Sequence, residues 1–389
     1  MDKKRAVVLV HGYGHFKRNE RRDILVRSLA LNDPLPVAPP TDAAIEGETF
    51  KRLRPAQGQD PARPVVDVYE AHWSDMIPQD AEASPLSRFV NSTKLVAYWL
   101  MNPWWLKTLR MSRSFTAGLV LSGLLILLWY VSIIVALAVL MTAEGSPGEV
   151  QALPDDSDLV SIVLSGLRPV FVEVESMART PAFVFMIALL SFLRIDALAS
   201  IASFARLYLL SGANQGFEAE LIQRVQDVLE KVYARRRDGE PERPEYDEVI
   251  LLGHSLGGVI ALEAIANYGN PAVQQRTVLV TWGSPLAMLS HRSPERIAVR
   301  LKQACEGSVP RWVDVYSKND WLSSPVKEHL EAYPNASFSP EFTVAWWYTL
   351  AQSHNQYYYH SDVLRMLLDT DVMSMARLRS VGTGVESGD

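Results

Sequence analysis

Short apolar runs bounded by turn residues occur in the first and last thirds of the chain. Four of these runs favour β-strands because they are short and rich in Val and other strand-forming residues. They cover 6–10, 249–252, 277–281 and 312–316. The periodicity of 218–237 predicts an amphipathic helix, and apolar runs at 259–265 and 362–368 predict two more. The pattern therefore predicts strands and helices in turn at both ends of the chain, whereas the proline-rich segment 31–64 favours an irregular surface excursion.

The middle third has a different pattern. No charged residue occurs from Ser114 to Ala143, and a membrane span needs about 20 apolar residues. The run predicts a transmembrane helix over 115–141. Strands from both ends of the chain must join one sheet on one side of a bilayer, so we expect a return span, with 181–205 as the best candidate. Together these segments predict an inserted α-helical transmembrane hairpin.

The flanking charges orient this hairpin. Lys and Arg precede the first span, and Glu and Asp follow it, which places the N-terminal side in the cytoplasm. The expected divisions are the N-terminal part of a domain of strands and helices, a helical membrane insertion, the C-terminal part of the same domain and a disordered tail. They cover 1–87, 88–214, 215–378 and 379–389.

Candidate chemistry begins with the sequence Gly-His-Ser-Leu-Gly-Gly at 253–258. It lies between a predicted strand and a predicted helix, the context of a nucleophile elbow. The turn exposes the hydroxyl of Ser255, and Gly253 and Gly257 avoid a Cβ clash between strand and helix. His254 and Leu256 flank the serine. The motif predicts acyl transfer through a covalent intermediate on Ser255 Oγ.

A serine nucleophile also needs a base and an orienting acid. Asp320 follows the predicted strand 312–316, at the strand end where ligands meet open α/β sheets; Asp314, inside that strand, is the alternative. His354 and His360 both precede the last predicted helix. We favour His354 because it lies further from the helix start and is followed by tyrosines that could wall the site.

An oxyanion hole needs two backbone N–H groups. Leu256, directly after the nucleophile, supplies one. The second is expected from Tyr13, in the loop after the strand 6–10. His11, Gly12 and Gly14 complete that loop, and its glycines let the backbone turn its amides toward the site.

These residues resemble the α/β-hydrolase superfamily, on its lipase and esterase side. The resemblance covers roughly 1–75 and 215–370, with the matching motifs at 11–14 and 253–258 and the candidates Asp320 and His354. It implies a mostly parallel sheet with helices on both faces, the chain order serine, acid, histidine, and ester hydrolysis without a cofactor.

Composition narrows the function further. The net charge of −6 gives no sign of nucleic-acid binding, and the single cysteine, Cys305, excludes an intrachain disulfide. Close His/Cys metal spacing, a P-loop and a dinucleotide fingerprint are all missing, so no metal or cofactor is expected. The sequence predicts a membrane-anchored serine hydrolase, on the cytoplasmic side of the cell membrane, that cleaves lipid or other hydrophobic acyl esters. A thioesterase, acyltransferase or peptidase, or a catalytically idle scaffold with the same fold, stays open.

Overall fold

The computed structural model describes most of the outer thirds of the chain and parts of the middle third. The described residues are 3–32, 37–45, 47–56, 63–78, 85–101, 106, 120–121, 123–131, 134, 195–210, 216–236, 244–304, 306, 309, 311–317, 320, 322–323, 326, 336–338 and 350–369.

An eight-stranded sheet forms the centre of the fold, in the order β2-β3-β4-β1-β5-β6-β7-β8. The six strands from β4 to β8 run parallel, and β2 and β3 are added antiparallel at one edge. The bounds are β1 Lys4–Val10, β2 Thr41–Ile45, β3 Glu48–Leu53, β4 Val65–Glu70, β5 Glu248–His254, β6 Thr277–Trp282, β7 Trp312–Val315 and β8 Ala336–Phe338. The expected mostly parallel sheet is present, but the segment expected to be irregular contributes a β-hairpin.

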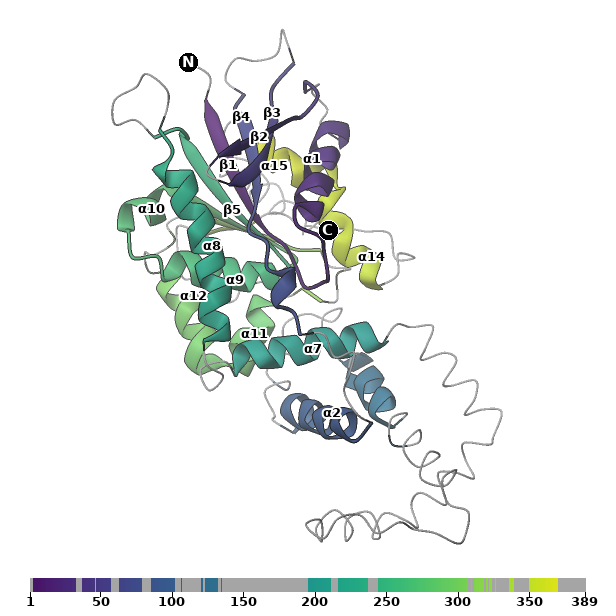
Figure 1. The fold of residues 1–389 in the computed structure, drawn as a ribbon. Helices are drawn as coiled ribbons and strands as arrows, with labels where there is room; N and C mark the ends of the chain where they lie inside the picture. The colour runs from purple at the N-terminus through teal and green to yellow at the C-terminus, as the bar shows by residue number, and fades with distance from the viewer. Residues whose placement is uncertain are drawn as a thin grey trace, which may run out of the picture. The chain divides into compact units, whose positions relative to one another are not determined.

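Helices cover both faces of this sheet. Figure 1 shows α1 and α15 on one side and α8, α9, α10 and α12 on the other. The bounds are α1 Glu20–Asn32, η1 Ser74–Met76, α8 Phe217–Ala234, α9 Leu256–Ala266, α10 Pro271–Arg276, α11 Leu286–Arg292, the π-helix η3 Pro294–Ala298, α12 Val299–Gln303, α14 Leu350–Asn355, η5 Gln356–Tyr358 and α15 Ser361–Leu368.

The core explains why the predicted strands form. Residues 6–10 of β1 have no exposed surface, and every residue of β5 is buried. Removing such apolar runs from water is the main favourable contribution to folding. Arg5 is also fully buried; it donates to Glu248 at 2.8 Å and to the Leu367 carbonyl at 2.7 Å. This contact joins β1 to β5 and to α15, near the other end of the chain.

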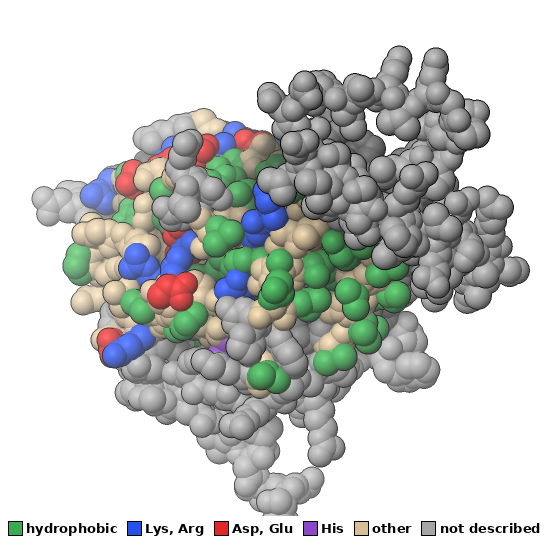
Figure 2. All heavy atoms as spheres, turned by 90° about the horizontal axis from the view of Figure 1, so that it is seen from below, with side chains coloured by type: hydrophobic (Ala, Val, Ile, Leu, Met, Phe, Trp, Pro, Cys, Tyr) green, Lys and Arg blue, Asp and Glu red, His purple; other side chains and the backbone are tan. Residues whose placement is uncertain are grey.

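The chain divides into two compact units. The first contains the sheet and comprises Met1–Ile77, Trp104–Leu119 and Leu207–Asp389; the second comprises Pro78–Pro103 and Val120–Arg206. In the second unit, α2 (Pro85–Leu100) contacts α7 (Ile195–Leu209), where Trp99 Nε1 donates to the Ala202 carbonyl at 3.1 Å. This unit exposes the apolar side chains Val120, Leu121, Leu124 and Leu127. Figure 2 shows hydrophobic side chains gathered on the face of the molecule that is seen from below.

The predicted transmembrane hairpin is wrong for the part of the chain that the structure describes. Among those residues, no helix is both long and apolar enough to cross a membrane. The second expected span, 181–205, overlaps α7, which has 15 residues and is shorter than the roughly 20 that a span needs. Most of 115–141, and 181–194, lie outside the described residues. The expected cytoplasmic side depends on these spans and stays a prediction.

Candidate active site

Ser255 occupies a sharp turn between β5 and α9. Its φ is 56° and its ψ −129°. Among the described residues, Asn19 is the only other non-glycine with a positive φ. Such a conformation costs about 1–3 kcal/mol and persists only where the surroundings enforce it. Here Ser255 N–H donates to the Trp282 carbonyl at 2.8 Å, and the Ser255 carbonyl accepts from Gly258 N–H at 2.9 Å. The turn thus holds a half-buried serine at the carboxyl end of the central strand.

Close backbone packing explains the glycines on both sides of this turn. A Cβ on Gly253 would lie 2.5 Å from Gly258 Cα, and a Cβ on Gly257 would lie 2.2 Å from the Val10 carbonyl oxygen. Backbone atoms cannot move aside for an added Cβ as the end of a flexible side chain can. The first turn of α9 is therefore packed directly against β1 and β5.

Asp320 and His354 meet beside this turn. Nδ1 of His354 lies 2.8 Å from Asp320 Oδ2, and both residues are buried. Because a carboxylate only accepts, Nδ1 carries the hydrogen and the Nε2 lone pair is free to accept a proton. Nε2 is buried without a hydrogen-bond partner. Ser255 Oγ therefore forms no hydrogen bond with Nε2 in this structure.

The two alternatives lie in different surroundings. Asp314, inside β7, accepts from Thr281 Oγ1 at 2.6 Å and from Val326 N–H at 3.2 Å. Burial raises the pKa of Asp314 to about 6. His360 precedes α15 as its N-cap residue and is half-buried. The structure therefore pairs Asp320 with His354, the two residues that the sequence favoured.

His254 was expected only as part of the motif, but it contacts His354 directly. Its Nε2 donates to the His354 carbonyl at 2.9 Å, and the two rings lie 4.9 Å apart. Burial, and then the nearby His354, hold the pKa of His254 well below its usual value. A neutral His254 thus ties the strand before the nucleophile to the backbone of His354.

Tyr357 was expected only to line the site, but it contacts Asp320 directly. Its hydroxyl donates to Asp320 Oδ2 at 2.9 Å and accepts from Ser317 N–H at 3.1 Å. Burial, and then the charge of Asp320, raise the pKa of Tyr357 well above its usual value. The hydroxyl stays protonated and continues to donate. Asp320 therefore accepts from the side chains of His354 and Tyr357 and from the backbone N–H of Leu322, which lies 3.1 Å from Oδ1.

The loop after β1 lies against the elbow. A Cβ on Gly12 would lie 2.9 Å from Ser255 Cβ and 3.1 Å from His254 Nδ1, so glycine is required for this approach. His11 is fully buried and stacks on Trp73, with ring centroids 4.9 Å apart. Ser74 Oγ donates to the Gly14 carbonyl at 2.8 Å. The loop that contains Tyr13 thus contacts the turn that contains Ser255 and Leu256. The roles of the Tyr13 and Leu256 N–H groups stay a prediction.

No family model, curated protein or solved structure matches the chain.

Proposed function

We propose that the protein is a serine hydrolase that cleaves acyl esters through a covalent acyl-enzyme. The observation that carries this proposal is the 2.8 Å contact between His354 Nδ1 and Asp320 Oδ2 beside the strained turn at Ser255. A hydrogen-bonded acid and histidine next to a serine is the arrangement on which nucleophilic serine catalysis depends. The motif resemblance to lipases and esterases of the α/β-hydrolase superfamily belongs to the same proposal.

In the first half of the proposed reaction, Ser255 Oγ attacks the ester carbonyl carbon while His354 Nε2 takes the hydroxyl proton. The carbonyl oxygen becomes an oxyanion that accepts from the N–H groups of Tyr13 and Leu256. The tetrahedral intermediate then collapses. The bond to the leaving alkoxide breaks, and His354 returns its proton to that oxygen. Asp320 stabilises the transient imidazolium and keeps the ring in the required tautomer.

In the second half, water replaces the alcohol. His354 takes one proton from the water while the water oxygen attacks the acyl carbon. His354 then protonates Ser255 Oγ as the carboxylic acid product leaves. Chemistry of this kind requires no cofactor. His254 and Tyr357 act indirectly, because they hold His354 and Asp320.

The proposal is tested with Ser255→Ala on purified full-length protein. Hydrolysis of 4-nitrophenyl esters of increasing chain length, and of the matched thioesters, gives the acyl preference and leaving group. Ser255→Ala should lower kcat/KM at least about 1,000-fold, because the nucleophile is lost while the remaining groups still bind substrate.

Ser290→Ala is the matched control. It removes a buried hydroxyl that donates to the Ala287 carbonyl within α11 at 2.7 Å, and should leave kcat/KM within a few-fold. Equal rates in the Ser255→Ala and wild-type proteins would refute the assignment. A folded wild type that hydrolyses no ester or thioester would favour the idle scaffold.

A further inference from the structure

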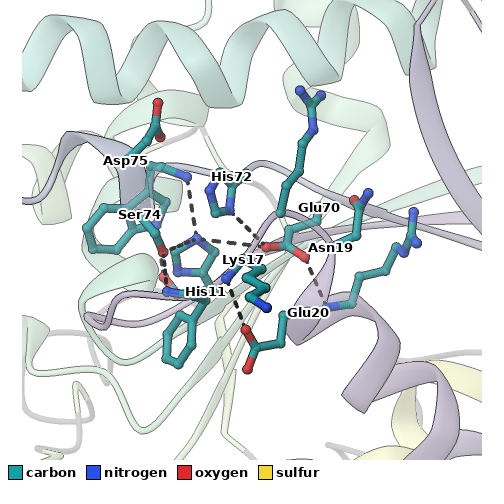
Figure 3. A network of polar contacts seen from close by, with 12 residues as sticks. His11, Lys17, Asn19, Glu20, Glu70, His72, Ser74 and Asp75 are labelled. Atoms are coloured by element: carbon teal, nitrogen blue, oxygen red, sulfur yellow. Dashed lines mark hydrogen bonds and ion pairs between the residues drawn. The ribbon is translucent and has the colours of Figure 1, made fainter.

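Two histidines and a glutamate converge where β1 and β4 end. His11 follows β1, Glu70 is the last residue of β4, and His72 lies two positions later. These strands are parallel neighbours in which Leu9 pairs with Glu70, so their carboxyl ends meet at one edge of the sheet. Figure 3 shows the three side chains pointing toward one another within a polar network. Residues from two separate segments thus form one cluster.

We propose that this cluster binds one zinc ion. Two imidazoles and one carboxylate are a donor set that zinc prefers, with a fourth position left open. Glu70 Oε1 lies 3.3 Å from His72 Nδ1 and 3.9 Å from His11 Nε2, and the three ligand atoms all lie within 4.8 Å of one another. Ligands bound tetrahedrally at about 2.1 Å lie roughly 3.4 Å apart. Small side-chain rotations therefore close the site around the ion.

The His11 ring has the tautomer that a metal requires. Its Nδ1 lies 2.8 Å from the Gly12 carbonyl oxygen, which only accepts, so Nδ1 carries the hydrogen and the Nε2 lone pair faces the cluster. The two polar groups nearest to Nε2, Trp73 N–H and Ser74 Oγ, both lie at 3.4 Å, beyond the usual hydrogen-bond distance. A metal-bound histidine usually donates its other ring N–H to a carbonyl or carboxylate in this way.

Glu70 is oriented by a contact on its other oxygen. Arg22 N–H donates to Glu70 Oε2 at 3.1 Å, which leaves Oε1 to the histidines. The 3.3 Å contact with His72 is longer than the 2.7–2.9 Å typical of a charge-assisted hydrogen bond. Because a buried carboxylate needs a cation or full hydrogen bonding, a bound divalent ion satisfies Glu70 better than this long contact does. The His72 side chain keeps 14% exposure, so the ion has an approach from solvent.

The ion would connect the loop after β1 to the end of β4. That loop contains Gly12, which lies against Ser255. Zinc would thus stabilise the loop from which the second oxyanion donor is expected. The site itself requires neither Ser255 nor any catalytic activity, so its test is independent of the proposed hydrolase function.

The test is titration of chelator-stripped, tag-free full-length protein with Zn²⁺, in competition with a chromophoric chelator. We expect one ion per chain. His72→Ala and Glu70→Gln should each weaken binding at least about 10-fold, because each removes one of three ligands. Co²⁺ in place of Zn²⁺ should give visible ligand-field absorption that both variants lose. Zinc should also raise the melting temperature of the wild type but not of His72→Ala.

The controls are His15→Ala and Ser255→Ala. His15 lies in the same loop region but is exposed and outside the cluster, so both controls should bind zinc like the wild type. If Glu70→Gln fails to fold, the more exposed His72→Ala carries the test. Binding far below one equivalent, or undiminished affinity in His72→Ala, overturns the proposal. If the zinc site is present while Ser255→Ala retains full hydrolysis, only the hydrolase proposal fails.

Discussion

At the scale of single residues, burial decides which carboxylates can act. Asp320 and Asp314 are both buried and lie six positions apart in sequence. Asp320 accepts from an imidazole, a phenol and one backbone N–H, whereas Asp314 accepts from a threonine hydroxyl and one backbone N–H. In the proposed mechanism, only Asp320 stabilises a positive charge on a histidine. The two aspartates therefore have separable effects on rate and on stability.

Substitution of Asp320 should lower the rate of ester hydrolysis far more than substitution of Asp314. Asp320→Asn keeps the shape but removes the charge that holds His354 Nδ1–H, so kcat should fall on the order of 1,000- to 10,000-fold. Asp314→Asn should change kcat less than about 10-fold. The measurement is ester hydrolysis by the two variants at matched fractions of folded protein. A larger loss of rate in Asp314→Asn would reverse the assignment.

Asp314→Asn should instead change how stability depends on pH. Burial raises the pKa of Asp314 from 3.8 to about 6 in the folded protein. A folded pKa above the unfolded value gives a stability contribution that is complete below about pH 4 and is lost as pH rises through 6. This loss is on the order of 3 kcal/mol. Urea unfolding at pH 4 and pH 7.5 should therefore show a smaller decline for Asp314→Asn than for the wild type; parallel declines would contradict the shift.

At the scale of elements, the site depends on how closely α9 approaches the sheet. Ser255 directly follows the fully buried strand β5, and α9 begins one residue later. The first turn of this helix lies against the carbonyl oxygens of Val10 and His11, at the end of β1. The same close approach brings Gly12 to Ser255. A shift of α9 would therefore disturb both the nucleophile and the loop beside it.

Gly257→Ala tests this packing. Its Cβ would lie 2.2 Å from the Val10 carbonyl oxygen and 2.4 Å from that of His11. The variant should lose about 1–3 kcal/mol of unfolding free energy, or more, because the obstructing atoms are backbone. Gly269→Ala is the control, since its Cβ meets nothing within 4 Å and should change stability by less than about 0.5 kcal/mol. Urea denaturation compares them, and equal midpoints would show that α9 has room to move.

At the scale of the whole molecule, the sequence predicted the elements that have a clear local pattern of apolar residues. The strands β1, β5, β6 and β7 follow from short apolar runs, and the pairing of Asp320 with His354 follows from where the runs end. The hairpin of β2 and β3 was missed because Thr41–Ile45 has few strand-forming residues and is ordered by pairing with its neighbours. Strand propensity depends on such context more than helix propensity does.

Contacts between residues far apart in the chain could not be predicted from local sequence patterns. Glu70 and His72 come close to His11 only because β4 and β1 are neighbours in the sheet, whereas metal motifs are recognised in sequence by short spacing. The transmembrane prediction started from an uncharged apolar run, and the described helices are shorter or less apolar than a span requires. The apolar composition of the middle third thus did not determine which kind of helix forms there.

The most direct test of the central claim is to locate a covalent adduct on the protein. Wild-type protein is treated with a fluorophosphonate, which reacts with activated serines, and its peptides are analysed by mass spectrometry. We expect one adduct, on Ser255, that is absent in Ser255→Ala and forms at least about 100-fold more slowly in His354→Ala because the base is lost. An adduct on another residue, or none on the folded wild-type protein, would contradict the assignment of Ser255 as the nucleophile.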